Sequence, residues 1–164
     1  MYKLIFLINN NKGDDVIKDI MSKKIIFSNL DSSIKDVAKK MLDNNIGFIP
    51  IKENDKYIGV ITDRDICLSI PSISSINDSI KSYITNSIVY IDVDSSIEEA
   101  LNTMSEKKVK RLLVKEKDNT IGVLSLSDIL NYSSNQNILN TYKSIFYIHD
   151  NEKSLIAEID EFYL

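Results

Sequence analysis

The sequence contains very little cysteine and histidine, one residue of each. Cys67 has no partner for an internal disulfide, which fits a protein of the reducing cytoplasm. One cysteine and one histidine cannot build a zinc site or a Cys–His catalytic pair. His149 lies outside the repeated part of the chain, where we expect it on the surface or packed in the tail. The aspartates, such as Asp63 and Asp65, lack the loop spacing of known cation sites. The sequence therefore predicts neither an enzyme nor a metal protein.

Positive charge is also in short supply, with 20 Lys and Arg against 24 Asp and Glu and a net charge of -4. Broad nucleic-acid binding needs an excess of basic residues, so we expect no nucleic-acid partner. The apolar run LIFLI at residues 4–8 is far shorter than the roughly 20 residues of a membrane helix. It also lacks the features of a secretory signal, so we expect no membrane partner. Residues 1–15 are an N-terminal extension, either an extra strand or a disordered start.

What the sequence does contain is an internal repeat. Hydrophobic residues make up 43% and charged residues 27% of the 164 residues, a profile typical of a soluble globular protein. The tetrapeptide DSSI occurs at residues 31–34 and again at residues 94–97, an offset of 63 residues. The same offset relates other identical residues, among them Met41 and Met104, Ile58-Gly59-Val60 and Ile121-Gly122-Val123, and Asp65-Ile66 and Asp128-Ile129. Because no gap is needed, residues 17–134 contain two copies of one unit.

Each copy is predicted to contain a strand, a helix, two more strands and a short second helix. Ser33-x-x-Asp36 and Ser96-x-x-Glu99 have the form of capping boxes at helix starts. The helices that follow carry one apolar stripe each, made of Ile34, Val37, Ala38, Met41 and Leu42 or of Ile97, Ala100, Leu101 and Met104. Short apolar runs predict the buried strands, GFIPI and YIGVI in the first copy and RLLV and TIGVL in the second. An earlier strand lies near residues 25–27 or 88–91, and the short helix begins at Thr62 or Ser125.

The predicted fold class is therefore α/β, two β-α-β-β-α units packed as a pseudo-twofold pair, with a helical C-terminal tail. A unit this small buries too little apolar surface alone, so the two copies should pack sheet against sheet. The expected boundaries are 1–15 for the extension, 16–72 and 79–134 for the two units, and 135–164 for the tail. The serine-rich stretch PSISSIND at residues 71–78 is the predicted joint between the units.

This pattern resembles the tandem CBS domain pair, also called a Bateman module. The matching residues are the helix after DSSI, the strand NIGFIPI, the segments GVITDRDI and GVLSLSDI, and VKRLLV in the second copy. The segment GVLSLSDI is particularly similar to nucleotide-binding segments in the regulatory γ subunit of AMP-activated kinase. The resemblance implies a non-catalytic sensor that needs no other cofactor. Such pairs bind an adenosine-containing ligand, most simply AMP, ADP or ATP, between the units and signal its level to a partner.

Two segments carry a hydroxyl–carboxylate box, Thr62-x-x-Asp65 and Ser125-x-x-Asp128. From the residues alone, each box is typical of a helix start, where the hydroxyl caps the helix and the acid bonds back from its first turn. A functional interpretation is compatible with the same geometry. A carboxylate can accept hydrogen bonds from both hydroxyls of a ribose, and a helix N-terminus attracts a phosphate. The CBS resemblance implies that these four residues, together with Ser127, hold the ribose.

Phosphates need cations, and the sequence offers few near the boxes. Arg64 lies inside the first box, and Lys110 and Arg111 open the strand VKRLLV, where CBS proteins often carry basic residues that contact phosphate. The alternative is a solvated basic run, because further lysines flank these two. The first copy has Gly47 and Phe48 at the equivalent places. We therefore expect two clefts of unequal affinity.

Three apolar residues, Ile26, Val89 and Ile49, are candidates to sandwich an adenine ring, and a place in the ordinary core is the alternative for each. Cys67 follows the first box on its helix, and we expect it to be a small core residue.

Residues 135–164 have no counterpart in the first copy. Apolar residues recur there at helical spacing, namely Ile138, Tyr142, Ile145 and Phe146, then Leu155, Ile156, Ile159 and Phe162. Such an aromatic tail should be buried, either against its own module or in a surface for a subunit or a partner. We expect a homodimer and a protein partner that binds through this tail. The acidic residues of the tail argue against a membrane-bound helix.

Two functions from different classes compete. The leading hypothesis is an adenine-nucleotide sensor without catalytic activity. The rival is a structural or adaptor protein, a CBS-like scaffold with empty clefts whose tail holds a partner. Intact boxes in both copies favour the sensor. The weak supply of basic residues in the first copy favours the scaffold for that cleft.

Overall fold

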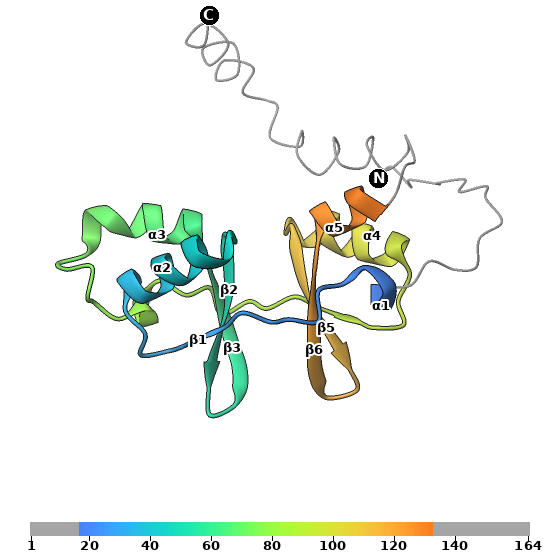
Figure 1. Ribbon diagram of the computed structural model, residues 1–164, viewed down its shortest axis with the longest axis horizontal. Helices are drawn as coiled ribbons and strands as arrows, with labels where there is room; N and C mark the ends of the chain where they lie inside the picture. The colour runs from blue at the N-terminus through green and yellow to red at the C-terminus, as the bar shows by residue number, and fades with distance from the viewer. Residues whose placement is uncertain (1–16, 133–164) are drawn as a thin grey trace, which may run out of the picture.

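The protein consists of two α/β units of matching architecture (Figure 1). The computed structural model describes residues 17–132. In each unit the first strand pairs parallel to the second, and the second pairs antiparallel to the third. The first sheet contains β1 (Ser28–Asn29), β2 (Phe48–Glu53) and β3 (Lys56–Thr62), and the second contains β4 (Tyr90–Asp92), β5 (Arg111–Glu116) and β6 (Asn119–Ser125). The predicted α/β fold class, a pair of β-α-β-β-α units, is confirmed.

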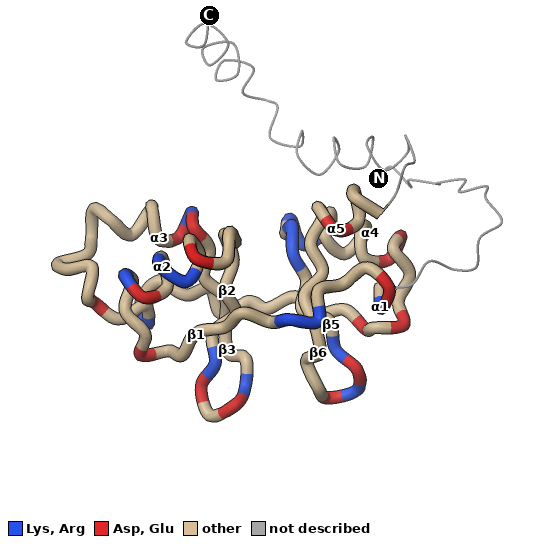
Figure 2. The backbone as a smooth tube through the Cα atoms, viewed as in Figure 1, with Lys and Arg blue, Asp and Glu red and all other residues tan. Residues whose placement is uncertain are grey.

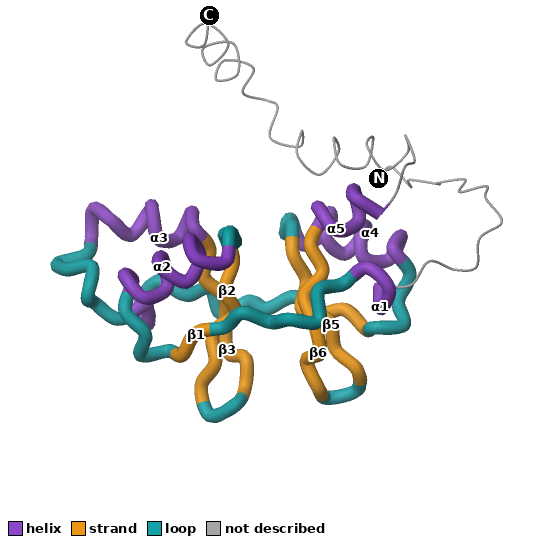
Figure 3. Tube along the Cα trace, viewed as in Figure 1, coloured by secondary structure: helices purple, strands orange, loops and turns teal. Residues whose placement is uncertain are grey.

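The two sheets face each other in the middle of the molecule, and the helices lie on their outer sides (Figure 1 and Figure 3). The helices are α1 (Ile17–Ile20), α2 (Ile34–Asn44), α3 (Asp63–Ser69), α4 (Ile97–Lys107) and α5 (Leu126–Tyr132), with short 3-10 helices η1 (Ile70–Ser72) and η2 (Ile80–Ser82). Within residues 17–132, no helix is long and apolar enough to span a bilayer. The N-terminal extension and the tail predicted for residues 135–164 lie outside the described residues.

The helices begin where the capping residues predict. Ser96 and Glu99 form a complete capping box on α4, in which each side chain bonds the backbone N–H of the other. Ser33 caps α2 by accepting a bond from the Asp36 N–H, but the Asp36 carboxylate accepts from the Ser33 hydroxyl at 2.7 Å and not from its backbone. Both caps satisfy N–H groups that the helix itself cannot.

The two units exchange their opening segments. Ile17 belongs to the first repeat, yet it is fully buried in the core of the second unit. Ile80 belongs to the second repeat, yet it is fully buried in the core of the first unit. The chain crosses the middle of the molecule once after α1 and once after η2, and both crossings are visible in Figure 1. Each core is therefore built from two separate stretches of sequence.

A close backbone approach holds each exchanged segment in place. Thr85 forms an antiparallel bridge with Val60 of β3, and Ser22 forms the equivalent bridge with Val123 of β6. A Cβ atom on Gly59 would lie 2.8 Å from the Thr85 carbonyl oxygen, and one on Gly122 would lie 2.8 Å from the Ser22 carbonyl oxygen. Glycine is needed at both positions because the crossing backbone fills the space that a side chain would occupy.

Some local predictions differ from the structure. The first strand of the first unit lies at Ser28–Asn29 and not at residues 25–27, because those residues belong to the crossing segment. The stretch 71–78, predicted as the joint, packs on the first unit: the Ile76 and Asp78 carbonyls accept bonds from the first turn of α2. The chain leaves the first unit only after Thr85.

Two side chains predicted to be buried are exposed. Leu42 was expected in the apolar stripe of α2, but 80% of its surface is exposed, because the stripe that faces the sheet ends at Met41. Cys67 was expected in the core, and it is an exposed free thiol on α3. Successive side chains of a helix point about 100° apart, so a residue next to a buried one, such as Leu42 after Met41, can face solvent.

The exchange of segments predicts an effect at a distance in sequence. Ile17→Ala should lower the free energy of unfolding by about 2–5 kcal/mol, because it empties a fully buried site. The loss of hydrogen-exchange protection should concentrate in β4, β5 and β6 of the second unit. Leu42→Ala, at an exposed site, is the control. Loss of protection confined to β2 and β3 would contradict the exchange.

Candidate functional site

Each hydroxyl–carboxylate box lies where the last strand of a unit runs into its short helix. Asp65 Oδ2 accepts a bond from the Thr62 N–H at 2.8 Å and from the Thr62 hydroxyl at 2.7 Å. The Asp65 N–H donates to Thr62 Oγ1 at 3.2 Å, which completes a capping box. The capping interpretation of this box is therefore confirmed.

The second box repeats this geometry. Asp128 Oδ2 accepts from the Ser125 N–H at 2.8 Å and from the Ser125 hydroxyl at 2.6 Å, and the Asp128 N–H donates to Ser125 Oγ at 3.2 Å. Within residues 17–132, all hydrogen bonds to the two box carboxylates use Oδ2. The other carboxylate oxygen, Oδ1, takes no part in the cap and retains its capacity to accept hydrogen bonds.

The strand that pairs with each box begins at the same position of the repeat, with Phe48 in the first unit and Arg111 in the second. Phe48 opens β2 and pairs with Thr62, and Arg111 opens β5 and pairs with Ser125. The Arg111 guanidinium carbon lies 5.7 Å from the centroid of the Phe48 ring, so the two units touch here through equivalent positions. A cation–π contact at a partly exposed site contributes about 0.5–1 kcal/mol. The sequence did not single out Phe48 as a site residue, although its match to Arg111 in the repeat was a usable signal.

The residues next to this contact differ in charge between the units. In the first unit the Asp63 N–H donates to the Gly47 carbonyl at 3.2 Å, and a Cβ atom on Gly47 would overlap the Asp63 carboxylate. In the second unit the equivalent bond runs from Leu126 to the Lys110 carbonyl at 2.9 Å. In Figure 2 basic residues mark the start of β5, whereas acidic and basic residues alternate at the start of α3.

The remaining predicted site residues differ in how deeply they are buried. Arg64 and Ser127 are exposed on the first turns of their helices, and the Arg64 N–H donates to Asp63 Oδ1 at 2.8 Å. Ile26 and Val89 are half-buried in or next to the crossing segments. Ile49 is fully buried in the first core, which matches the ordinary-core alternative for this residue.

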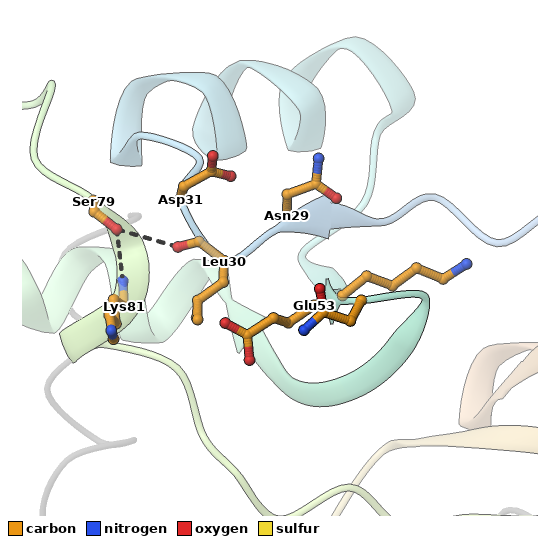
Figure 4. A pocket seen from close by; sticks show the side chains of 8 residues that line it. Asn29, Leu30, Asp31, Glu53, Ser79 and Lys81 are labelled. Carbon is orange, nitrogen blue, oxygen red and sulfur yellow. Dashed lines mark hydrogen bonds between the residues drawn. The ribbon is translucent and has the colours of Figure 1, made fainter.

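A pocket of about 450 Å³ lies at the opposite end of the first sheet (Figure 4). It is lined by Asn29, Leu30, Asp31, Lys52, Glu53, Asn54, Ser79 and Lys81. The Ser79 hydroxyl donates to the Leu30 carbonyl and accepts from the Lys81 N–H. β2 begins beside the box and ends at this pocket, so about 15–20 Å of strand separates the two. None of the predicted site residues lines this pocket.

Lys52 joins the pocket to a group of aromatic rings. Its ammonium nitrogen lies 4.4 Å from the centroid of the Phe27 ring and 4.7 Å from that of the Tyr57 ring. Burial raises the pKa of Tyr57 above its ordinary value of 10.0, and the neighbouring Tyr90 raises it further. Within residues 17–132, no group of His, Cys, Asp and Glu side chains is placed to hold a metal ion.

The repeated geometry agrees with a comparison against protein families. The family model of the CBS domain matches residues 17–72 and again residues 80–135. The chain belongs to the CBS domain family. Its two repeats are therefore a tandem CBS pair, as the sequence resemblance predicted.

Related CBS proteins extend this result. The pair is similar to the uncharacterised protein YlbB of Bacillus subtilis (strain 168), with 29% identity over 116 residues, covering 69% of this chain and 78% of that protein. The fold of this chain is similar to that of the CBS domain pair of protein MJ0100, solved in complex with 5′-methylthioadenosine and S-adenosyl-L-methionine. That match has a TM-score of 0.63 and 25% identity and covers 71% of this chain and 94% of that chain.

One enzyme also shares sequence with this CBS pair. A homoserine O-acetyltransferase of Methanococcus vannielii is 31% identical over 138 residues, which cover 77% of this chain but only 28% of that protein. The CBS pair of protein MJ0100 binds adenosine-containing ligands, and family membership supports a regulatory, ligand-binding module. The finer resemblance to the kinase γ subunit and the role of each site residue stay predictions.

Alanine substitutions test whether Gly47 faces a movable side chain, that of Asp63, while Gly59 faces the fixed backbone of Thr85. Gly47→Ala should change the free energy of unfolding by less than about 1 kcal/mol, because only the end of the Asp63 side chain must move. Gly59→Ala should cost about 1–3 kcal/mol, because the obstacle is the backbone carbonyl of Thr85. Urea unfolding of both variants measures the difference, and equal losses would contradict the placement of Asp63.

Proposed function

We propose that this CBS pair is a non-catalytic regulatory module that binds an adenine nucleotide, AMP, ADP or ATP, and signals its level to a partner. Support comes from the related CBS pair of protein MJ0100, whose two ligands both contain adenosine. The exposed free thiol of Cys67 favours a reducing compartment, so we assign the module to the cytoplasm. The module then senses the adenylate state of the cell.

The observation that carries this proposal is the pair of carboxylates at matching positions. Asp65 and Asp128 are half-buried, and each is held rigidly by its own cap through Oδ2. The second oxygen of each carboxylate is left to accept bonds from the 2′ and 3′ hydroxyls of a ribose. A clamp whose geometry is fixed before the ligand arrives loses little entropy on binding. Thr62, Ser125 and Ser127 complete the ribose contacts, and Ile26 and Val89 are the candidates that contact adenine.

Replacing the two acids tests this role. Asp65→Asn and Asp128→Asn each remove a charged acceptor, and a hydrogen bond to a charged group is worth about 1.5–3 kcal/mol. At least one variant should lose more than tenfold in affinity for AMP or ATP. A ligand at about one hundred times its dissociation constant stabilises the fold by about 2.7 kcal/mol, or roughly 5–10 °C in melting temperature. The measurement is the melting curve of each variant with and without nucleotide.

The chain offers a matched control in Asp36. This aspartate also occupies the third position of a helix and bonds a capping serine, but it lies on α2, away from both boxes. Asp36→Asn should lower the melting temperature slightly and leave the nucleotide shift intact. If the wild-type protein shows no shift with any adenine compound, or if both box variants keep the full shift, the sensor proposal is wrong and the scaffold alternative replaces it.

We also propose that the module is a homodimer that contacts its protein partner through residues 135–164. Apolar side chains on the contacting helices α2 and α3 and in η1 support a subunit surface, since Leu42, Leu68 and Ile70 are more than half exposed. Their repeat counterparts are the polar residues Ser105, Asn131 and Ser133. This surface is therefore a property of the first unit alone.

Light scattering tests the assembly. Cutting the chain after Ser134 should weaken the homodimer and leave each module folded. Leu68→Asn, which installs the residue of the second repeat, should also weaken it if the helices of the first unit take part. A full-length protein that is monomeric at micromolar concentration would contradict the homodimer.

A further inference from the structure

The two boxes differ in the groups that a phosphate would meet. Beside the second box, Arg111 opens β5 and Lys110 directly precedes it. The uncharged Leu126 stands at the position that Asp63 holds in the first unit. The Arg111 guanidinium is held over the Phe48 ring of the opposite unit. The guanidinium carries five N–H donors, and an anion beside it can accept hydrogen bonds from them.

Beside the first box lies a carboxylate, that of Asp63, whereas the second box has the basic residue Lys110 nearby. The Asp63 carboxylate fills the space that a Cβ atom on Gly47 would need, whereas Lys110, the repeat counterpart of Gly47, carries a side chain. Phe48, the counterpart of Arg111, contributes an aromatic ring and no charge. Arg64 is flanked by Asp63 and Asp65 in sequence, so two negative charges accompany the one cation near this box. Between the first and the second unit, Gly47 is replaced by Lys110 and Asp63 by Leu126. The local charge beside the box therefore changes from negative to positive.

We propose that the CBS pair sorts its ligands by charge: the second box takes a phosphate-bearing adenosine ligand, and the first box takes an adenosine ligand without a phosphate. This rests on the proposed function and names the ligand class of each box. A phosphate monoester carries up to two negative charges and binds where cations outnumber carboxylates. Near the first box the Asp63 carboxylate repels it. Phe48 is a positioning residue, which acts by holding Arg111.

AMP and adenosine are the matched probes, because they differ only in the phosphate. Calorimetric titration of the full chain should give one AMP site per chain. Arg111→Gln and Asp128→Asn should each weaken AMP binding more than tenfold, whereas Asp65→Asn should change it less than twofold. Arg111→Gln should leave adenosine binding within twofold of the wild type. Asp63→Asn should create or strengthen a second AMP site.

The role of Phe48 has its own readout. Phe48→Leu should reduce the preference for AMP over adenosine several-fold without changing the affinity for adenosine, and Phe48→Tyr should restore the preference. A loss of affinity for both compounds would indicate a merely structural role.

The outcomes separate this inference from the function on which it rests. Two equivalent AMP sites, or AMP binding that depends on Asp65 and not on Asp128, would overturn the sorting by charge and leave the sensor intact. Equal affinity for AMP and adenosine at both boxes would do the same. If neither compound binds and S-adenosylmethionine also fails to bind, the proposed function itself is wrong.

Discussion

Thr85 and Ser22 lie so close to Gly59 and Gly122 that neither glycine can carry a side chain. These two contacts bind each sheet to a segment that arrives from the opposite repeat, and the rest of the arrangement depends on them. Because each core is completed by the other repeat, neither unit is whole without its partner. The shared cores also hold the two sheets face to face, with the box ends of both hairpins on the same side of the molecule (Figure 1).

The exchange explains why equivalent positions meet. Phe48 and Arg111 open the same strand in the two units, and a pseudo-twofold relation between the units brings these strand starts together. Symmetric placement does not require symmetric chemistry. One position carries an aromatic ring and the other a cation, and these two groups attract each other where two arginines would repel. The difference between the repeats thus stabilises the contact between them.

In each box the carboxylate has a structural task that is compatible with the ribose binding proposed for it. The cap engages Oδ2 of Asp65 and of Asp128 and holds each carboxylate at the start of a short helix. A cap of this kind contributes about 1 kcal/mol to stability, a modest amount that many helices obtain without any ligand. The same constraint fixes the direction of the remaining oxygen, which is the property that a ribose clamp needs. Capping and binding are therefore complementary interpretations of these residues.

The sequence alone predicted the repeat, the β-α-β-β-α order of each unit, the starts of α2, α3, α4 and α5 and the two boxes, but not α1, η1 or η2. Capping residues and apolar periodicity act over a few neighbouring residues, which is why these features could be predicted. It could not determine which core Ile17 or Ile80 enters, since the two segments occupy equivalent repeat positions and satisfy either unit locally. It also could not place the Asp63 carboxylate against Gly47 or the Arg111 guanidinium on Phe48. The first contact depends on the register between β2 and β3, in which Phe48 pairs with Thr62. The second joins residues of different units, and only the packing of the two sheets brings them within reach.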